Sequence, residues 1–411
     1  MSFPKKLLII ARVPHYRYRG EVYAYTPYAR EIDIWADLFE EVSVAGTLLD
    51  EAPPGDCSSF ARDNVRVLPV SEAGGNGFRA KLSQLVALPR IVWELATYLR
   101  KADAVHVRCP CDLGLLGVIM GPMFSRYLIA KYAGQWSPFP GEPLAWRLQR
   151  AILRSIWWKG PVTVYSGSSE EPSKVIPFFT SMLTDEQIAG AKIAAAKPRD
   201  PKCFRLLFVG RLSAARNVDV LLQAFSTLKL PGRKLECVVV GEGPERAALE
   251  KLATSLGIRE QTKFLGGLRF EEVLSCYGSA NVLVLAAESE GWGKAITEAM
   301  AFGCVCIGSD RGIMPKILEE GRGMVVPPRN LEALQNALQH IADHPLEAAK
   351  MSKRAAQWAQ RFSLDGLRTA LRELMVKSWE IEDRGGVIGS VEEGVQGALY
   401  NPRSPAASVR R

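Results

Sequence analysis

Short apolar runs alternate with helical periodicities along most of the chain. Leu7–Ala11, Arg205–Gly210 and Val282–Ala286 are largely apolar stretches, as in parallel strands that are covered on both faces. Because helical patterns separate such runs, the sequence predicts an α/β fold. The other predicted strands are Glu41–Gly46, Val65–Val70, Ala104–Val107, Val238–Val240, Lys263–Leu265, Gly303–Ile307 and Gly323–Val326.

Several predicted helices have recognisable ends. Lys294–Phe302 is rich in strong helix formers and is followed by Gly303, which suits a left-handed helix end. Ser363 is a candidate cap for a last helix that runs to about Trp379. The other predicted helices include Leu82–Arg100, Leu331–His344 and Leu346–Phe362.

The length of 411 residues suits two domains and a tail. Ala194–Pro201 is rich in small residues and proline and breaks the periodicity, so we interpret it as the linker. The predicted domains are therefore residues 1–196 and 197–362. Residues 382–411 have little apolar content and are predicted to form a disordered tail.

The stretch Ser289–Ile307 carries the strongest candidate chemistry. Gly291, Trp292 and Gly293 form a turn that leads into the helix beginning at Lys294, and its glycines permit unusual backbone angles or close approach of a ligand. The N–H groups of a first helical turn and the helix dipole attract an anion. The sequence therefore predicts a seat for a phosphorylated ligand such as a diphosphate.

Two carboxylates flank this seat. Glu290 precedes the helix and Glu298 lies more than a turn inside it, so the two can address different parts of one ligand. A carboxylate accepts hydrogen bonds from a pair of neighbouring hydroxyls, as in a ribose or a hexose. An isolated Glu298 would more simply pair with a neighbouring cation on the helix face.

The pattern Glu290-Gly-Trp-Gly293, four residues, then Glu298-Ala-Met-Ala-Phe-Gly303 resembles the donor-site signature of retaining GT-B glycosyltransferases of family 4, the glycosyl transferases group 1. The similarity extends from about Leu206 to about Ile341. It implies two Rossmann-like α/β/α domains facing a cleft, with the acceptor on the first and a nucleotide sugar on the second. A helix at about residues 363–380 would cross back to the first domain. By this resemblance Glu290 holds the donor sugar and Glu298 the ribose.

The turn Gly210-Arg211-Leu212 is followed by Arg216. Arg211 and Arg216 resemble the two cations with which this family binds the donor diphosphate. Guanidinium groups bind phosphate oxygens well and would oppose the charge that builds on a departing nucleoside diphosphate. The expected catalytic residues are therefore Glu290, Arg211 and Arg216. We expect no metal and no other cofactor.

The same resemblance places Gly241 beside the donor and Leu265 near the base. Gly241 and Gly243 follow a strand, but the third glycine of a dinucleotide fingerprint is absent and Pro244 intervenes, which argues against NAD.

Candidate acceptor residues lie in the first half of the chain. Arg12, His15 and Arg17 lie in the predicted loop that follows the first strand, and both an acceptor site and a solvated basic loop remain open interpretations. Relatives often carry His-x-His where this chain has His106-Val107-Arg108. His106 is then either an acceptor residue or a core residue, and Arg108 would face the cleft as a cation.

One segment has the pattern of a membrane-surface helix. Leu144, Leu148, Ile152 and Ile156 recur at helical spacing, and Arg147, Arg150 and Arg154 form a basic stripe. Such a helix either lies on an anionic membrane or packs on a core with a solvated arginine face.

The net charge of +8 and the pI near 9.0 indicate an anionic partner. We expect no nucleic acid as a partner, because no motif for nucleic-acid binding is present.

The eight cysteines lack C-x-x-C spacing and indicate core residues in a reducing cytosol. No apolar run is long enough to span a bilayer. The expected location is cytoplasmic, with a peripheral position at the inner face of the membrane as the alternative.

The sequence predicts a hexosyltransferase that moves a sugar from a UDP- or GDP-sugar to a glycan or lipid-linked acceptor, with retention, in polysaccharide or cell-envelope glycan biosynthesis. The alternatives are a GT-B nucleotide-sugar epimerase, a glycoside hydrolase that uses Glu290 and Glu298, and an inactive binding module.

Overall fold

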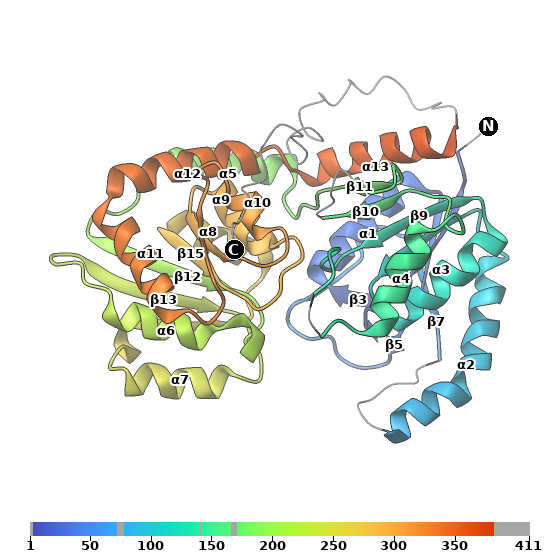
Figure 1. Ribbon diagram of the computed structural model, residues 1–411, viewed down its shortest axis with the longest axis horizontal. Helices are drawn as coiled ribbons and strands as arrows, with labels where there is room; N and C mark the ends of the chain where they lie inside the picture. The colour runs from blue at the N-terminus through green and yellow to red at the C-terminus, as the bar shows by residue number, and fades with distance from the viewer. Residues whose placement is uncertain (1–2, 72–77, 140, 166–170, 382–411) are drawn as a thin grey trace, which may run out of the picture. The chain divides into compact units, whose positions relative to one another are not determined.

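The computed structural model describes residues 3–71, 78–139, 141–165 and 171–381 (Figure 1). The predicted disordered tail at residues 382–411 lies outside these residues. The described chain divides into two compact units. The first unit holds residues 3–53, 57–179 and 366–381, and the second unit holds residues 54–56 and 180–365.

The units divide after Phe179, whereas the sequence analysis put the boundary at residue 196. The reason is helix α5 (Asp185–Ala196), which packs against α9 (Lys294–Ala301) and α12 (Pro345–Ala359) in the second unit. Only residues 194–196 of the predicted linker belong to α5, a regular helix with a capping box at Thr184, and residues 197–201 form a loop inside the second unit.

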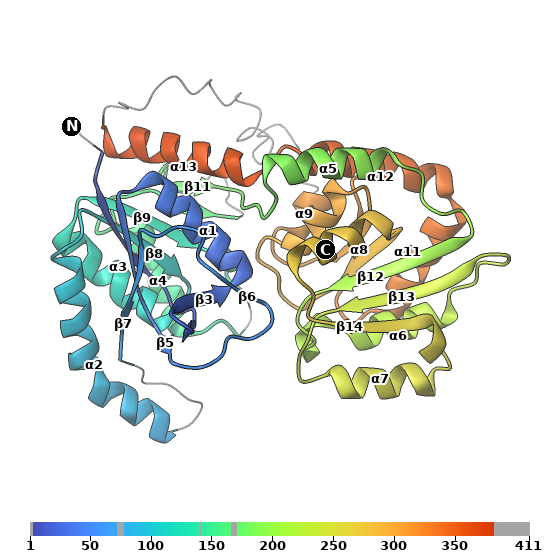
Figure 2. The same cartoon turned by 180° about the vertical axis from the view of Figure 1, so that it is seen from behind.

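The first unit is built on a seven-stranded parallel sheet with the order β11-β10-β9-β8-β1-β4-β7. Helices α2, α3 and α4 cover one face, and α1 and α13 cover the other (Figures 1 and 2). The strands are β1 (Lys6–Ile10), β4 (Glu41–Gly46), β7 (Val65–Pro69), β8 (Ala104–Cys109), β9 (Tyr127–Tyr132), β10 (Val162–Val164) and β11 (Val175–Pro177). The helices are α1 (Thr26–Leu38), α2 (Phe78–Leu99), α3 (Asp112–Phe124), α4 (Leu144–Arg154) and α13 (Leu364–Trp379).

A hairpin replaces part of the predicted Arg12–Gly20 loop. β2 (His15–Tyr18) pairs antiparallel with β3 (Glu21–Tyr25), and β5 (Leu48–Leu49) and β6 (Cys57–Ser59) complete a small mixed sheet. The turn between β2 and β3 has positive φ at both Arg19 and Gly20. Two such residues suit a tight hairpin turn, but an arginine in this conformation gives no signal in the sequence.

The second unit is built on a six-stranded parallel sheet with the order β14-β13-β12-β15-β16-β17. One helical layer contains α5, α8, α9 and α12, and the other contains α6, α7 and α11 (Figures 1 and 2). The strands are β12 (Cys203–Val209), β13 (Lys234–Val240), β14 (Thr262–Gly266), β15 (Val282–Leu285), β16 (Val305–Ser309) and β17 (Met324–Val326). The helices not yet given are α6 (Val218–Thr227), α7 (Arg246–Ser255), α8 (Phe270–Ser279), α10 (Met314–Leu318) and α11 (Leu331–Asp343), with 3-10 turns at Ala214–Arg216 and Arg259–Gln261.

Both large sheets are parallel, so the prediction of an α/β fold with parallel sheets is confirmed. In each unit the loops that leave the carboxyl ends of the strands gather at one edge, where ligands bind in such sheets. No described helix is long and apolar enough to cross a membrane.

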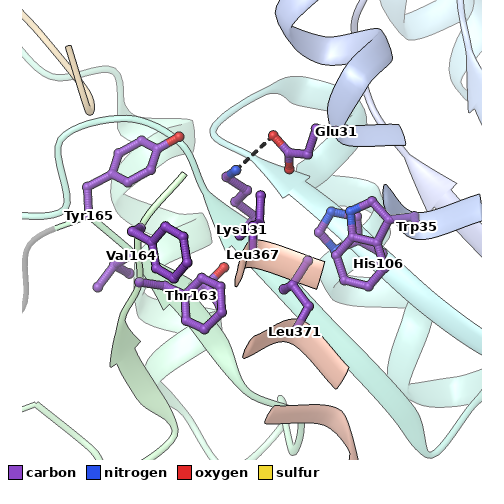
Figure 3. Close-up of a pocket in the computed structure, with 11 residues that line it drawn as sticks. Glu31, Trp35, His106, Lys131, Thr163, Val164, Tyr165, Leu367 and Leu371 are labelled. Atoms are coloured by element: carbon purple, nitrogen blue, oxygen red, sulfur yellow. Dashed lines mark hydrogen bonds and ion pairs between the residues drawn. The ribbon is translucent and has the colours of Figure 1, made fainter. Parts of the chain in front are cut away.

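Two histidines are buried in the first unit. His106 on β8 is fully buried and stacks on Trp35 of α1, with 4.5 Å between the ring centroids, and Leu371 of α13 lies nearby (Figure 3). His15 is also fully buried, and its Nδ1 lies 3.0 Å from the carbonyl oxygen of Thr47. Burial lowers the pKa of His106 from 6.5 to about 3 and that of His15 from 6.5 to about 4.

Because both folded-state pKa values lie below 6.5, the unfolded chain takes up these protons first as the pH falls. The two neutral histidines contribute fully to the free energy of unfolding above pH 6.5. This contribution is lost as the pH falls toward 4 for His15 and toward 3 for His106. For each histidine, we expect the free energy of unfolding to decrease by about 2 kcal/mol when the pH is lowered from 7 to 5.

Chemical denaturation of His106→Phe at pH 7 and pH 5 measures this effect, since phenylalanine retains the ring contact with Trp35 but cannot titrate. The variant should lose less stability on acidification than the unaltered protein. His344→Gln, at an exposed histidine, is the control and should retain the original pH dependence. An equal loss in the His106→Phe variant and the unaltered protein would contradict the prediction.

Candidate functional site

The loops after β12 and β15 lie against each other at the carboxyl edge of the second unit's sheet. The backbone N–H of Glu288 donates to the carbonyl oxygen of Ala215 at 2.9 Å. Asn217 Nδ2 donates to the carbonyl oxygen of Ala286, also at 2.9 Å, and Asn217 is buried. These bonds bring together two segments that are about 75 residues apart in the chain.

Arg216 and Glu290, both predicted from the sequence, form an ion pair in which Arg216 Nη1 donates to Glu290 Oε2. Their side chains are 30% and 14% exposed, so the pair is partly buried at the edge of the sheet. Each group holds the other in place. Arg211, the other predicted cation, is exposed at the end of β12.

Helix α9 begins at Lys294, and the preceding residue Gly293 has a φ of +66°. A Cβ atom there would overlap the end of the Met314 side chain, so a larger residue would be strained in this backbone conformation and would displace Met314. No described side chain caps the first turn of α9. The predicted anion seat at Gly291, Gly293 and the half-buried Lys294 therefore faces an uncapped helix terminus.

Trp292 lies between these residues but has a different environment. Its ring is 2% exposed and packs on Trp358 and Phe362, with centroid distances of 6.4 and 6.0 Å. A contribution of Trp292 to ligand binding would therefore come from its backbone, while its side chain anchors the loop to the core.

Glu298 is buried inside α9 and accepts a hydrogen bond of 2.8 Å from the hydroxyl of Tyr277. Burial and then the neighbouring Glu298 carboxylate raise the pKa of Tyr277 well above its ordinary value, so this phenol keeps its proton and donates. Tyr277 thus orients the carboxylate. Tyr277 could not be recognised as a site residue from the sequence, because a single inward aromatic residue on a helix usually indicates only core packing.

The ends of β12, β13 and β14 are joined through backbone contacts. Gly241 N donates to the carbonyl oxygen of Gly266 at 2.8 Å, and Gly210 N donates to that of Val240 at 3.0 Å. A Cβ atom at Gly241 would overlap the carbonyl oxygen of Gly210. The predicted residues Gly210 and Gly241 are therefore neighbours, and Leu265 is 43% exposed on β14.

The structure places the acceptor-side candidates of the first unit in different environments. Arg12 pairs with Asp112, and Arg17 Nη1 lies 3.4 Å from Asp50 Oδ1 with both side chains exposed. His15 is buried as described above.

Arg108 belongs to a buried charged cluster that sequence reasoning did not find. Its Nη1 donates to Glu31 Oε1 at 2.6 Å, and Lys131 Nζ donates to Glu31 Oε2 at 2.8 Å (Figure 3 shows the second pair). One carboxylate is thus shared by two cations from β8 and β9. His106 and Lys131 line a small cavity of about 10 Å³, which is room for about one water molecule.

Helix α4 differs from the core-packed interpretation of its apolar stripe. Leu144, Leu148 and Ile156 are 77%, 50% and 95% exposed, so that interpretation is wrong for these three residues. The core-facing positions of α4 are Gln149, Arg150 and Leu153. Arg150, predicted to be on a solvated stripe, is buried because it pairs with Glu142.

Most of the second unit is similar to a known protein family. Residues 191–358 match the family described as Glycosyl transferases group 1. The alpha-D-kanosaminyltransferase of Streptomyces kanamyceticus is 30% identical over 161 residues, which cover 39% of this chain and 42% of that protein. A D-inositol 3-phosphate glycosyltransferase of Saccharomonospora viridis is 32% identical over 201 residues, covering 46% of each chain. The chain thus spans less than half the length of these curated relatives.

Solved structures are similar over most of the chain. Sucrose-phosphate synthase from Thermosynechococcus elongatus has a TM-score of 0.67 at 20% identity and covers 92% of this chain and 99% of its own. Anabaena HepE in complex with UDP and glucose has a TM-score of 0.65 at 17% identity and covers 91% and 100%. The predicted two-domain Rossmann-like architecture of the GT-B type is therefore confirmed, and residues 191–358 match the Glycosyl transferases group 1 family.

Proposed function

We propose that this protein is a retaining glycosyltransferase that moves a hexosyl group from a UDP- or GDP-sugar to a glycan or lipid-linked acceptor. The observation that carries the proposal is the Arg216–Glu290 ion pair beside the uncapped start of α9, within a Glycosyl transferases group 1 domain. Anabaena HepE, which shares the fold, has been solved with UDP and with UDP-glucose. This supports a nucleotide sugar as the donor.

In the proposed complex the donor diphosphate binds Arg211, Arg216 and the first turn of α9. Each supplies positive charge or N–H donors that suit phosphate oxygens. Glu298 binds the ribose hydroxyls, and Tyr277 holds its carboxylate in a fixed orientation. Binding replaces the Arg216–Glu290 contact, so that the cation turns to the diphosphate and the carboxylate to the sugar.

The positions of Arg216 at the diphosphate and of Glu290 at the sugar also assist the reaction. As the bond between the anomeric carbon and the phosphate oxygen breaks, positive charge grows on the sugar ring and negative charge on the diphosphate. Glu290 stabilises the first and Arg216 the second. The acceptor hydroxyl oxygen forms the new bond to the anomeric carbon and gives up its proton to an oxygen of the departing nucleoside diphosphate. With these groups in place we propose that the reaction needs no metal.

The acceptor is proposed to bind the first unit, in a pathway of polysaccharide or cell-envelope glycan synthesis at the inner face of a membrane. Exposed apolar side chains gather on α3, α4 and the turn after α4, where Trp157 Nε1 donates to the carbonyl oxygen of Ile119 at 3.1 Å. Exposed cations lie among them, including Arg147 and Lys159. Apolar side chains beside cations suit an anionic lipid surface. The exposed apolar residues are Ile119, Met123, Leu144, Leu148, Ile156 and Trp157.

Thermal-shift measurements with UDP, GDP, ADP and their sugars test the proposed donor class. A ligand at about 100 times its dissociation constant stabilises the folded state by about 2.7 kcal/mol, so a nucleotide sugar that binds should raise the melting temperature measurably. Product analysis with and without an added acceptor then separates transfer from epimerisation. The absence of a shift with every nucleotide and nucleotide sugar would overturn the proposed function.

Substitutions of Glu290 and Glu298 should have different effects on the steady-state kinetics. Glu290→Ala should lower kcat more than it raises the donor KM, because its charge stabilises the transition state more than the ground state. Glu298→Ala should chiefly raise the donor KM, since a ribose contact binds both states about equally. Steady-state kinetics in EDTA measure both effects. A pure KM defect in both variants, or loss of all activity in EDTA, would contradict this division of roles.

The membrane proposal predicts that Ile156→Ser and Trp157→Ser each weaken binding to vesicles that contain phosphatidylglycerol. Burying one such side chain contributes about 1.5–3 kcal/mol, so each change should lower the partition coefficient by about tenfold or more. Sedimentation of vesicles with bound protein gives this coefficient. Ile193→Ser is the matched control, because Ile193 is 62% exposed on α5 in the second unit. Equal binding by all variants, or equal binding to vesicles of phosphatidylcholine alone, would exclude the proposed surface.

A further inference from the structure

The turn between β17 and α11 contains an arginine in a conformation that favours glycine. Pro328 is the second and Arg329 the third residue of this turn, which Asn330 N closes by donating to the carbonyl oxygen of Pro327 at 3.3 Å. Arg329 has a φ of +56°. Proline at the second position and positive φ at the third are the features of a type II turn, whose third position suits glycine.

A side chain in this region costs free energy, because Cβ crowds the neighbouring carbonyl. Such a residue persists where its surroundings fix it, and strained backbone of this kind concentrates at functional sites. The question is therefore what the side chain of Arg329 contacts.

The guanidinium group of Arg329 reaches both segments that carry the ion pair of the donor site. Its Nε donates to Glu288 Oε1 at 2.7 Å, and its Nη2 lies 3.4 Å from the carbonyl oxygen of Ala214. Glu288 is two residues before Glu290, and Ala214 is two residues before Arg216. Arg329 thus bridges the loop after β12 and the loop after β15 from a third strand exit.

These contacts add little to the stability of the fold. The side chains of Arg329 and Glu288 are 55% and 39% exposed, and ion pairs with this exposure have small net free energies. Stability therefore does not explain an arginine at a position that suits glycine. Arg329 instead contributes to the geometry of the site, since its planar guanidinium group fixes the acceptor atoms of Glu288 and Ala214 relative to each other.

We propose that Arg329 is a positioning residue of the donor site, which holds residues 214–216 and 288–290 in register when the donor replaces the Arg216–Glu290 ion pair. In the ligand-free protein that ion pair joins the two segments together with the backbone bond from Glu288 to Ala215 and the bond from Asn217 to Ala286. A donor must separate the pair, and the bridge through Arg329 does not depend on it. The inference rests on the proposed function for its link to the donor, whereas the bridge itself can be measured without a ligand.

Arg329→Gly tests the proposal, because glycine relieves the backbone strain and removes the bridge. We expect an unchanged or higher melting temperature, faster hydrogen–deuterium exchange in residues 213–217 and 286–290, and an increase in the dissociation constant of UDP. A misplaced site should lower kcat/KM by roughly tenfold to a hundredfold. Arg329→Lys should give intermediate values, since an ammonium group can still pair with Glu288 but lacks the planar fork.

Glu320→Gly is the matched control. Glu320 also has a positive φ, of +58°, and its carboxylate pairs with Arg322 and not with residues 214–216 or 288–290. Glycine there should leave exchange in both segments, UDP affinity and kcat/KM unchanged.

The outcomes separate this proposal from the proposed function. If the unaltered protein binds no nucleoside diphosphate, the proposed function fails, and with it the role of Arg329 toward the donor, while the exchange data still report on the bridge. Unchanged exchange in both segments of Arg329→Gly overturns the proposal, as does faster exchange without any change in UDP affinity or kcat/KM. The combination of faster exchange, weaker UDP binding and an undiminished melting temperature supports it.

Discussion

The parallel pairing of β12 with β15 is the constraint on which the second unit's site depends. Leu206 pairs with Val282 and Leu207 with Leu283, so two strands distant in the chain end side by side. Their exits then lie together, which places Arg216 next to Glu290. Other strand arrangements would separate these residues. The chemistry proposed for the site thus follows from the sheet order, and the side chains are distributed over loops that this order aligns.

The two carboxylates of the site are held by different physical means. Glu290 is partly buried and pairs with a cation, so a ligand that displaces this cation must offer the carboxylate a partner of its own. Glu298 is buried and bonded to a neutral phenol that remains protonated. A buried carboxylate needs such a donor, because an unsatisfied one would be strongly destabilising. One carboxylate is therefore adaptable and the other is fixed.

Much of the second unit could be predicted from the sequence, because its signals are local. The apolar run at Val282–Leu285 and the glycine after α9 determine their elements with little outside help. Partners from distant segments could not be predicted. Glu31 and Lys131 are 100 residues apart, and nothing in either neighbourhood indicates the other. The hairpin at Arg19 was missed for a related reason, since a residue with positive φ that is not glycine leaves no mark in the sequence.

Trp292 affects how the loop that carries Glu290 can recognise a ligand. Its ring packs on Trp358 and Phe362 in the core, so the backbone between Glu290 and Gly293 is anchored before any ligand arrives. A loop that is ordered in advance loses little conformational entropy on association. Affinity at this edge of the sheet is therefore governed by the fit of the ligand to groups already in place, and discrimination between ligands rests on shape and charge.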